Sequence, residues 1–171
     1  KGISSDNGDG DGGVSRRVLG TLLTWMAERE EPVLMVATAN DISQLPPELI
    51  RKGRFDEIFF VDFPGAEARA QIARIHLKKR GHDPSSFDVD GFARLAEGFS
   101  GAEIEQAIVS ASFEARSRSE TMTSADILAE LERTRPLSVV MAEKIDALRD
   151  WASERAVYAD ESTHESADDS S

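Results

Sequence analysis

Three polar side chains near the middle of the first half of the chain have types and spacing suited to chemistry on a phosphate. Asn40 follows the apolar residues 33–37, and a short helix-like step then delivers Arg51 and Arg54. A carboxamide offers a donor and an acceptor without charge, so it can contact a terminal phosphate and orient an attacking water. A guanidinium is permanently ionised and planar, and it stabilises charge that develops on phosphoryl oxygens. The order of these residues therefore fits phosphoryl transfer.

Each of these side chains also has a purely structural interpretation. Asn commonly follows a strand as a turn former that caps the local backbone. Arg at a helix end is usually solvated or paired with a surface carboxylate. Asp56 could orient one of the two arginines through a charge-assisted pair, or it could be a surface charge. The residues alone leave both interpretations open.

The elements that must position these residues change in character at about Pro64. Before it, residues 14–26 carry apolar side chains at helical spacing. Residues 33–37 and 58–61 are short apolar runs, which are typical of strands buried on both faces of a parallel sheet. The first part is therefore expected to be α/β, and the second part all-helical.

Beyond Pro64 the apolar spacing, the caps and the breakers predict five helices. Two of them begin with a capping box, in which a hydroxyl and a carboxylate satisfy backbone donors at the helix start; these are Ser100–Glu103 and Thr123–Asp126. The predicted helices are Ala66 to Arg80, Phe87 to Ala96, Ser100 to about Ser117, Thr123 to about Arg133, and Leu137 to about Ala156.

Composition excludes several classes of protein. The 171 residues are 40% hydrophobic, which is enough for one moderate core. Cysteine is absent, so disulfide scaffolds and thiolate metal sites are excluded. His76, His82 and His164 lack the spacing of metal ligands, and no metal site is predicted. No apolar run approaches the about 20 residues of a membrane span. The net charge of −12 opposes binding to nucleic acid and to anionic lipid, so neither partner is expected.

The stretch VATANDISQLPPELIRKGRFDEIFF, followed by helices only, resembles the second half of an AAA ATPase module. The resemblance covers roughly residues 14–133. It implies the C-terminal part of a P-loop α/β subdomain with parallel strands, followed by an α-helical lid. The phrases LLTWM, KGRFDEIFFVDFP and GFSGAEIEQAI are most similar to a subgroup known from a conserved chloroplast reading frame and its cyanobacterial and bacterial counterparts. The expected divisions are a flexible loop at 1–13, the partial α/β subdomain at 14–64, the lid at 65–135, an appended helix at 136–157 and a disordered acidic tail at 158–171.

The resemblance also implies roles for individual residues. Asn40 matches the family's first sensor of the phosphate, and Arg51 and Arg54 match its arginine fingers, which act on the nucleotide of a neighbouring subunit. Four residues match positions that lie against the base of the nucleotide: Ile72, His76, Gly101 and Ala102. The structural alternatives remain that the histidine is a packed bystander and that Gly101 and Ala102 simply start a helix well.

The phosphate-binding signature G-x-x-x-x-G-K-S/T does not occur, and no apolar strand ends in Asp-Glu. The family carries both upstream of the matched region, so the ligands of ATP and Mg²⁺ are expected there. The segment is then a fragment that hydrolyses ATP only at background rate by itself.

The resemblance implies that the parent is a homo-oligomeric ring, most often a hexamer, that hydrolyses ATP and remodels a protein partner. The expected location is the cytoplasm, or the chloroplast stroma for a plastid protein. Two alternatives stay open: a non-catalytic interaction module derived from this family, and a nucleic-acid-loading relative. The net charge and the absence of an Arg at the start of the lid helix count against the second.

Overall fold

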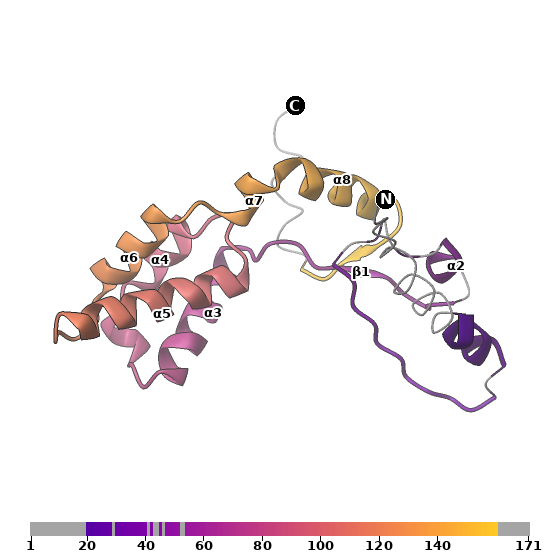
Figure 1. Cartoon of the computed structure of the whole chain (residues 1–171), viewed down its shortest axis with the longest axis horizontal. Coiled ribbons are helices and arrows are strands. Elements are labelled where there is room, and N and C mark those ends of the chain that lie inside the picture. The colour runs from indigo at the N-terminus through magenta and orange to yellow at the C-terminus, as the bar shows by residue number, and fades with distance from the viewer. Residues whose placement is uncertain are drawn as a thin grey trace, which may run out of the picture. The chain divides into compact units, whose positions relative to one another are not determined.

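A computed structural model describes residues 20–28, 30–40, 42, 45, 47–51 and 54–160 (Figure 1). The chain divides into two compact units, Lys1–Glu57 and Ile58–Ser171. The predicted flexible loop at 1–13 lies outside the described residues, as does the predicted tail from residue 161 onward. Each unit is considered by itself below.

The first unit contains a helical segment at residues 20–28 and the short helix α2, Pro47–Ile50, whose Leu49 is buried. The prediction of a buried strand at residues 33–37 is wrong. Residues 32–39 form no regular element, and Leu34 and Val36 are 91% and 81% exposed. A strand needs a hydrogen-bonded neighbour, and no described residue of this unit belongs to a strand that could pair with it.

Four helices of the second unit enclose its core: α3 (Ala66–Lys79), α4 (Val89–Leu95), α5 (Gly101–Ser117) and α6 (Ser124–Arg133). A short 3₁₀ turn, η2, Pro84–Ser86, precedes α4. Leu77 of α3 and Ile104 and Ile108 of α5 are the largest fully buried side chains. The spacing of Ile104 and Ile108, one helical turn apart, explains why α5 turns one face to the core. The helices predicted between Pro64 and Arg133 are confirmed, with small shifts at their ends.

The capping box predicted at the start of α5 is confirmed. The backbone N–H of Ser100 donates to the Glu103 carboxylate over 2.7 Å, and the N–H of Glu103 donates to the Ser100 hydroxyl over 3.3 Å. At the start of α6, the backbone N–H and the hydroxyl of Thr123 both donate to the Asp126 carboxylate, over 2.8 and 2.7 Å. These bonds satisfy donors that a helix start otherwise leaves unpaired.

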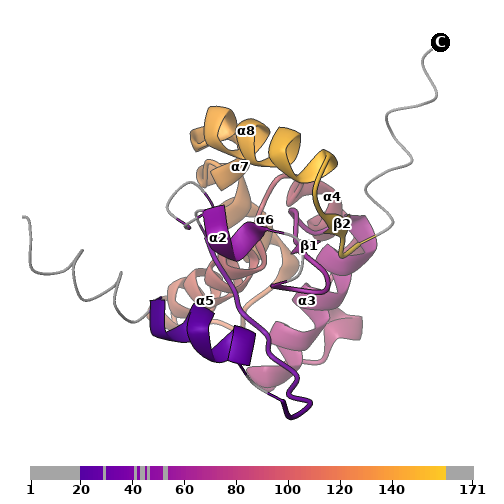
Figure 2. The same cartoon turned by 90° about the vertical axis from the view of Figure 1, so that its right-hand side faces the viewer.

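The predicted single helix after Pro136 is two helices, α7 (Leu137–Val140) and α8 (Ala142–Ser153). Met141 interrupts it with φ −118° and ψ 28°. Figure 2 shows α7 and α8 running along one side of this unit. The two helices contact different parts of the unit: Leu137 at the start of α7 contacts Glu103, and Arg149 of α8 contacts Asp62.

A two-stranded parallel sheet joins the two ends of the second unit. Strand β1, Phe59–Phe60, pairs with β2, Val157–Tyr158, with Phe59 opposite Val157 and Phe60 opposite Tyr158. The predicted strand at 58–61 is therefore confirmed, but its burial on both faces is not, since Phe59 is 63% exposed. The prediction of disorder from Tyr158 is wrong for residues 158–160, because the N–H of Ala159 donates to the carbonyl of Phe60 over 2.9 Å.

None of the helices in the described part of the chain is long and apolar enough to cross a membrane.

Candidate functional site

Asn40 lies at a bend that follows the extended residues 32–39, and its side chain is exposed. It forms no side-chain hydrogen bond with any other residue that the structure describes. The turn-capping role considered for this amide would require such a bond to the local backbone. The carboxamide is therefore available to solvent in this unit.

Arg51 and Arg54 follow α2 and differ in what holds them. Nη1 of Arg54 donates to the carbonyl of Leu23 over 3.3 Å, so this guanidinium is tied to the helical segment of its own unit. The exposed Arg51 side chain makes no hydrogen bond or ion pair with another described residue. Asp56 is also exposed and pairs with neither arginine. Of the two arginines, Arg51 has the guanidinium that is uncommitted within the described chain.

Of the four residues predicted to contact a base, Ile72, His76 and Gly101 lie along one seam between α3 and α5, and Ala102 is an exposed residue of α5. Ile72 and His76 are one turn apart on α3, while Gly101 and Ala102 open α5. A Cβ at position 101 would lie 3.5 Å from Cδ1 of Ile72. The absence of a side chain at Gly101 thus leaves the apolar flank of Ile72 uncovered at the start of α5. The structure brings these two helices together, as the predicted site requires.

His76 is fixed by two charged neighbours that the sequence analysis did not identify. Nη2 of Arg80 donates to Oε1 of Glu105 over 3.0 Å, and Nδ1 of His76 lies 3.2 Å from the same oxygen. Nη1 of Arg80 lies 3.4 Å from Nδ1 of His76 and also donates to the His76 carbonyl over 3.2 Å. The hydrogen bond from Arg80 holds the pKa of the Glu105 carboxyl below its ordinary range.

The His76 side chain is 17% exposed, and its Nδ1 lies beside both a donor, Nη1 of Arg80, and an acceptor, Oε1 of Glu105. The seam therefore combines an apolar flank, a backbone position without a side chain and a partly exposed imidazole, which suits the flat face and polar edge of a purine.

Spacing gives only a partial signal for Arg80 and Glu105. Glu105 is four residues after Gly101, and Arg80 is four residues after His76, so each lies on the same helix face as a residue that was singled out. The sequence does not show that this face of α3 packs on this face of α5.

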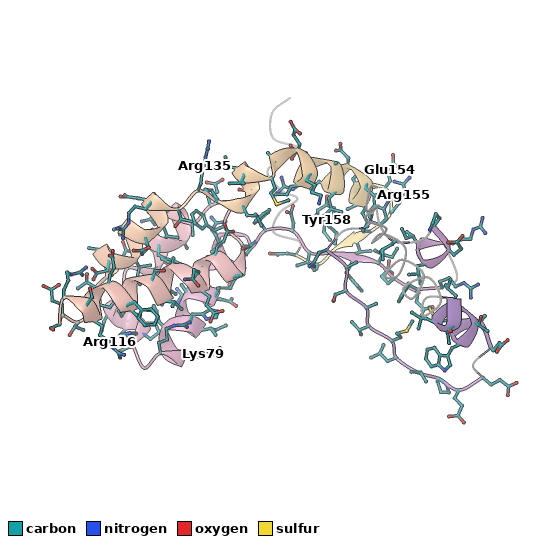
Figure 3. The ribbon with its side chains drawn as sticks, in the orientation of Figure 1. Lys79, Arg116, Arg135, Glu154, Arg155 and Tyr158 are labelled. Carbon is teal, nitrogen blue, oxygen red and sulfur yellow. The ribbon has the colours of Figure 1, made fainter. Side chains whose placement is uncertain are left out.

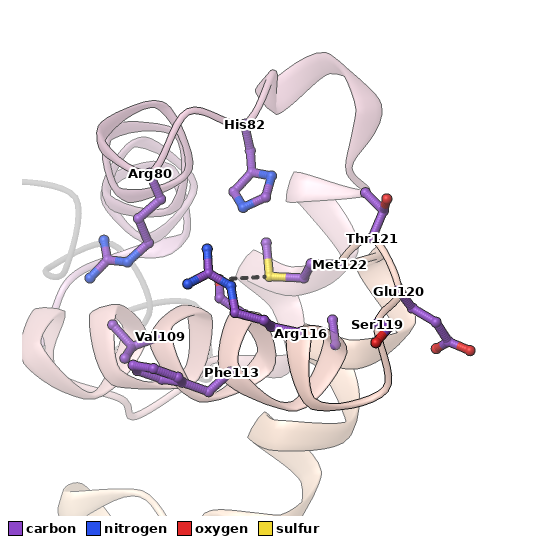
Figure 4. Close-up of a pocket in the computed structure, with 11 residues that line it drawn as sticks. Arg80, His82, Val109, Phe113, Arg116, Ser119, Glu120, Thr121 and Met122 are labelled. Atoms are coloured by element: carbon purple, nitrogen blue, oxygen red, sulfur yellow. Dashed lines mark hydrogen bonds between the residues drawn. The ribbon is translucent and has the colours of Figure 1, made fainter.

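A separate hollow of about 560 Å³ lies beyond the end of this seam (Figure 4). Arg80, His82, Phe113 and Arg116 line it, together with residues of the turn that follows α5. Figure 3 shows Arg116 near the end of α5 that is remote from α7. None of the four predicted base contacts lines this hollow, so it is distinct from the seam.

Comparison with known proteins agrees with the resemblance seen in the sequence. Residues 2–63 match the model of the ATPase family associated with various cellular activities (AAA). The AAA domain-containing protein ycf46 of Guillardia theta is 44% identical over 154 residues, which is 90% of this chain and 30% of that protein. The proteasome-activating nucleotidase of Aeropyrum pernix is 32% identical over 126 residues, 70% of this chain and 31% of that protein.

A third relative is the ATP-dependent zinc metalloprotease FtsH 2 of Bdellovibrio bacteriovorus. It is 40% identical over 102 residues, 59% of this chain and 16% of that protein. The chain thus spans less than a third of the length of the curated relatives it matches. The matched family model covers the segment that carries Asn40, Arg51 and Arg54, and the relatives extend the similarity through the helices. The chain therefore belongs to the AAA family of ATPases.

Proposed function

We propose that this chain is the C-terminal part of a subunit that binds and hydrolyses ATP in a homo-oligomeric ring, most simply a hexamer. In this proposal Asn40 senses the terminal phosphate, and Arg51 and Arg54 complete the nucleotide site of the adjacent subunit. The helices α3 to α6 serve as the lid over the base. Hydrolysis is coupled to the remodelling of a protein partner.

The observation that carries the proposal is the state of Arg51. Its side chain is exposed and has no partner among the described residues, although the chain carries a net charge of −12 and offers many carboxylates. An arginine in such a chain commonly finds a local carboxylate. A guanidinium left uncommitted next to a short helix is available for a phosphate supplied by another subunit.

The seam between α3 and α5 supports the second part of the proposal. Ile72 offers an apolar flank, Gly101 leaves it uncovered, and His76 offers an imidazole held beside Arg80 and Glu105. These features suit the base of ATP, and the exposed Ala102 follows Gly101 in the first turn of α5. The phosphates and Mg²⁺ need other residues. The described residues contain no group of three or more His, Cys, Asp or Glu side chains placed to hold a metal ion.

Protein remodelling is proposed from the names of two relatives of this chain. Two of the relatives are named as a proteasome-activating nucleotidase and an ATP-dependent metalloprotease, and both names refer to work on proteins. The acidic chain argues against nucleic acid as the alternative partner, since a surface of this charge repels a phosphate backbone.

The test is subunit mixing with the full-length protein that contains this sequence. One subunit carries Arg51→Ala, and the other keeps Arg51 but has a disabled nucleotide pocket. Each alone should lose activity, because an arginine finger contributes about 10³–10⁵ in rate. In a random one-to-one ring, about a quarter of the interfaces would combine an intact pocket with an intact finger, so mixing should restore a corresponding share of the rate.

The matched control is Arg135→Ala, since Figure 3 shows Arg135 projecting away from the ribbon between α6 and α7. This variant should hydrolyse ATP at the wild-type rate. A mixture that stays inactive would contradict action in trans. Full activity of Arg51→Ala rings would contradict any catalytic role for Arg51, and loss of activity in neither the variant nor the pocket-disabled subunit would leave the interaction module as the better explanation.

A further inference from the structure

The segment from α7 to β2, residues 137–158, touches the rest of its unit at two distant places. We call it the C-terminal strap. One end starts next to α5 and the other ends beside β1, and Figure 1 shows α8 leading from the first place to the second. Neither contact was expected from the sequence, which predicted one appended helix.

The first contact is made by the carboxylate of Glu103. Its Oε2 accepts from the backbone N–H and the hydroxyl of Ser100, over 2.7 Å each, and so completes the cap of α5. Its other oxygen, Oε1, accepts from the backbone N–H of Leu137 over 2.9 Å. One side chain therefore satisfies donors at the starts of two helices, α5 and α7.

Close packing supports this contact. Gly98, in the turn that leads into α5, has φ +77°, and a Cβ placed there would lie 2.3 Å from Oγ of Ser138. A side chain at residue 98 would require Ser138 to shift at this separation. The start of α7 thus lies directly against the turn before Gly101 and Ala102.

The second contact is an ion pair that joins residues 87 positions apart. Nε and Nη2 of Arg149 donate to the two carboxylate oxygens of Asp62, over 2.8 and 3.0 Å. Asp62 has a side chain that is only 12% exposed, and two parallel bonds fix the orientation of both partners. The pairing of β1 with β2 and the edge-to-face contact of Phe60 with Tyr158, 5.1 Å between ring centroids, lie beside this pair.

We propose that Glu103 and Arg149 are positioning residues that couple the start of α5 to β1 through the C-terminal strap. This proposal rests on the proposed function, in which Gly101 and Ala102 contact the nucleotide base. A ligand that shifts the start of α5 then shifts Leu137, the strap and β1, which follows Arg54 closely in the sequence. The strap thus links the proposed base contact at the start of α5 to β1 at the start of the second unit.

The chemistry of Glu103 allows a selective test. In Glu103→Gln the amide oxygen can still accept the bonds from Ser100, and Gln is an accepted partner in a capping box. The remaining atom is an NH₂ group, which cannot accept from the N–H of Leu137. The substitution therefore removes the contact with α7 and retains the cap of α5.

Amide hydrogen exchange on the 171-residue chain measures the coupling. Glu103→Gln should speed exchange at Leu137 about five- to tenfold, as expected for loss of one hydrogen bond. If the strap couples its two ends, Glu103→Gln should also speed exchange at the distant amides of Val157 and Ala159. These amides donate to the carbonyls of Ile58 and Phe60. Glu143→Gln is the matched control, since Glu143 is an exposed glutamate in the first turn of α8.

The reciprocal variant is Arg149→Lys, which keeps the charge and loses the two-pronged bond. It should speed exchange at Val157 and Ala159 and also at Leu137. The double variant Asp62→Arg, Arg149→Asp swaps the two charges. It should restore part of the protection from hydrogen exchange at Leu137, Val157 and Ala159. Changes confined to the amides next to each substitution would overturn the coupling, and Asp62→Asn gives the same decision if an Arg149 variant does not fold.

Nucleotide binding separates the two proposals. In the full-length protein, Arg149→Lys should weaken the binding of a fluorescent ADP analogue several-fold with little change in thermal midpoint. Wild-type affinity in this variant would overturn the positioning role. If the wild-type protein binds no nucleotide, the proposed function fails, while the exchange results on the 171-residue chain still decide whether the strap couples the two places.

Discussion

Replacing Gly98 with Ala tests how closely α7 packs on the turn before α5. Two glycines of the second unit have positive φ, Gly81 at +80° and Gly98 at +77°. They differ in surroundings: a Cβ at Gly81 would meet nothing within 4 Å, whereas one at Gly98 would lie 2.3 Å from Oγ and 3.4 Å from Cβ of Ser138. Gly81→Ala therefore measures backbone strain alone, and Gly98→Ala measures strain together with the contact.

The magnitudes follow from these surroundings. A left-handed conformation costs a non-glycine residue about 1–2 kcal/mol, and the stiffer unfolded chain offsets about 0.4–1 kcal/mol of this. We expect Gly81→Ala to lower the free energy of unfolding by about 1 kcal/mol. At Gly98, overpacking adds about 1–3 kcal/mol, so the expected total loss is about 2–4 kcal/mol.

Urea unfolding followed by far-ultraviolet circular dichroism measures both losses. Ser138→Ala removes the Oγ that the new methyl group would meet, and it should return about 1 kcal/mol to the Gly98→Ala variant while changing the wild type little. Equal losses for the two alanine variants, or no effect of Ser138→Ala, would refute the close packing of α7 against residue 98.

Two further predictions concern charged side chains. Arg69, 9% exposed, donates through Nε to the Ala93 carbonyl over 2.7 Å and through Nη1 to the Pro64 carbonyl over 2.9 Å; Arg69→Met should cost about 2–4 kcal/mol in urea unfolding, and Arg69→Lys should recover little of it because an ammonium does not span both carbonyls. The hydrogen bond from Arg133 lowers the pKa of Glu114. A carboxyl whose pKa is lower in the folded than in the unfolded chain stabilises the fold above its unfolded pKa, and this contribution is lost as the pH falls through the folded pKa. The urea concentration at the midpoint of unfolding should therefore decrease as the pH is lowered below about 4. Glu114→Gln should make this decrease shallower. An unchanged pH dependence would show that the pairing of Glu114 with Arg133 contributes nothing.

The helices of the second unit could be predicted because their signals are local. The Ser100 and Glu103 cap, the break at Gly81 and the apolar spacing of Ile104 and Ile108 all lie within a few residues of the ends and faces they define. Each of these signals specifies the conformation of the backbone within one or two turns. The packing of the core favours the same helices.

The errors concern elements whose state depends on a distant partner. The apolar run at residues 33–37 has the composition of a strand but no neighbour to pair with among the described residues of its unit. Tyr158 lies in a polar, acidic stretch, yet it pairs with Phe60. The break at Met141 lies between two contacts, those of Leu137 with Glu103 and of Arg149 with Asp62, that a helical pattern does not reveal.

The candidate site divides in the same way. Sequence patterns identified Ile72, His76 and Gly101, and the structure places all three on one seam. They did not identify Arg80 and Glu105, because the ion pair between them forms only when α3 packs beside α5. The functional roles of all the predicted site residues stay predictions, and the subunit-mixing experiment addresses Arg51 directly.

The parallel pairing of β1 with β2 has a consequence for the growing polypeptide. Asp62 leaves the ribosome 87 residues ahead of Arg149, which takes roughly 5 to 20 seconds at the usual speed of translation. During that interval Phe59 and Val61, both largely exposed even in the finished sheet, form an apolar edge without its partner strand. The α3–α6 bundle, built from neighbours in sequence, can close early. The nascent chain therefore carries an unpaired strand edge at β1 from the closure of the bundle until residue 157 is made.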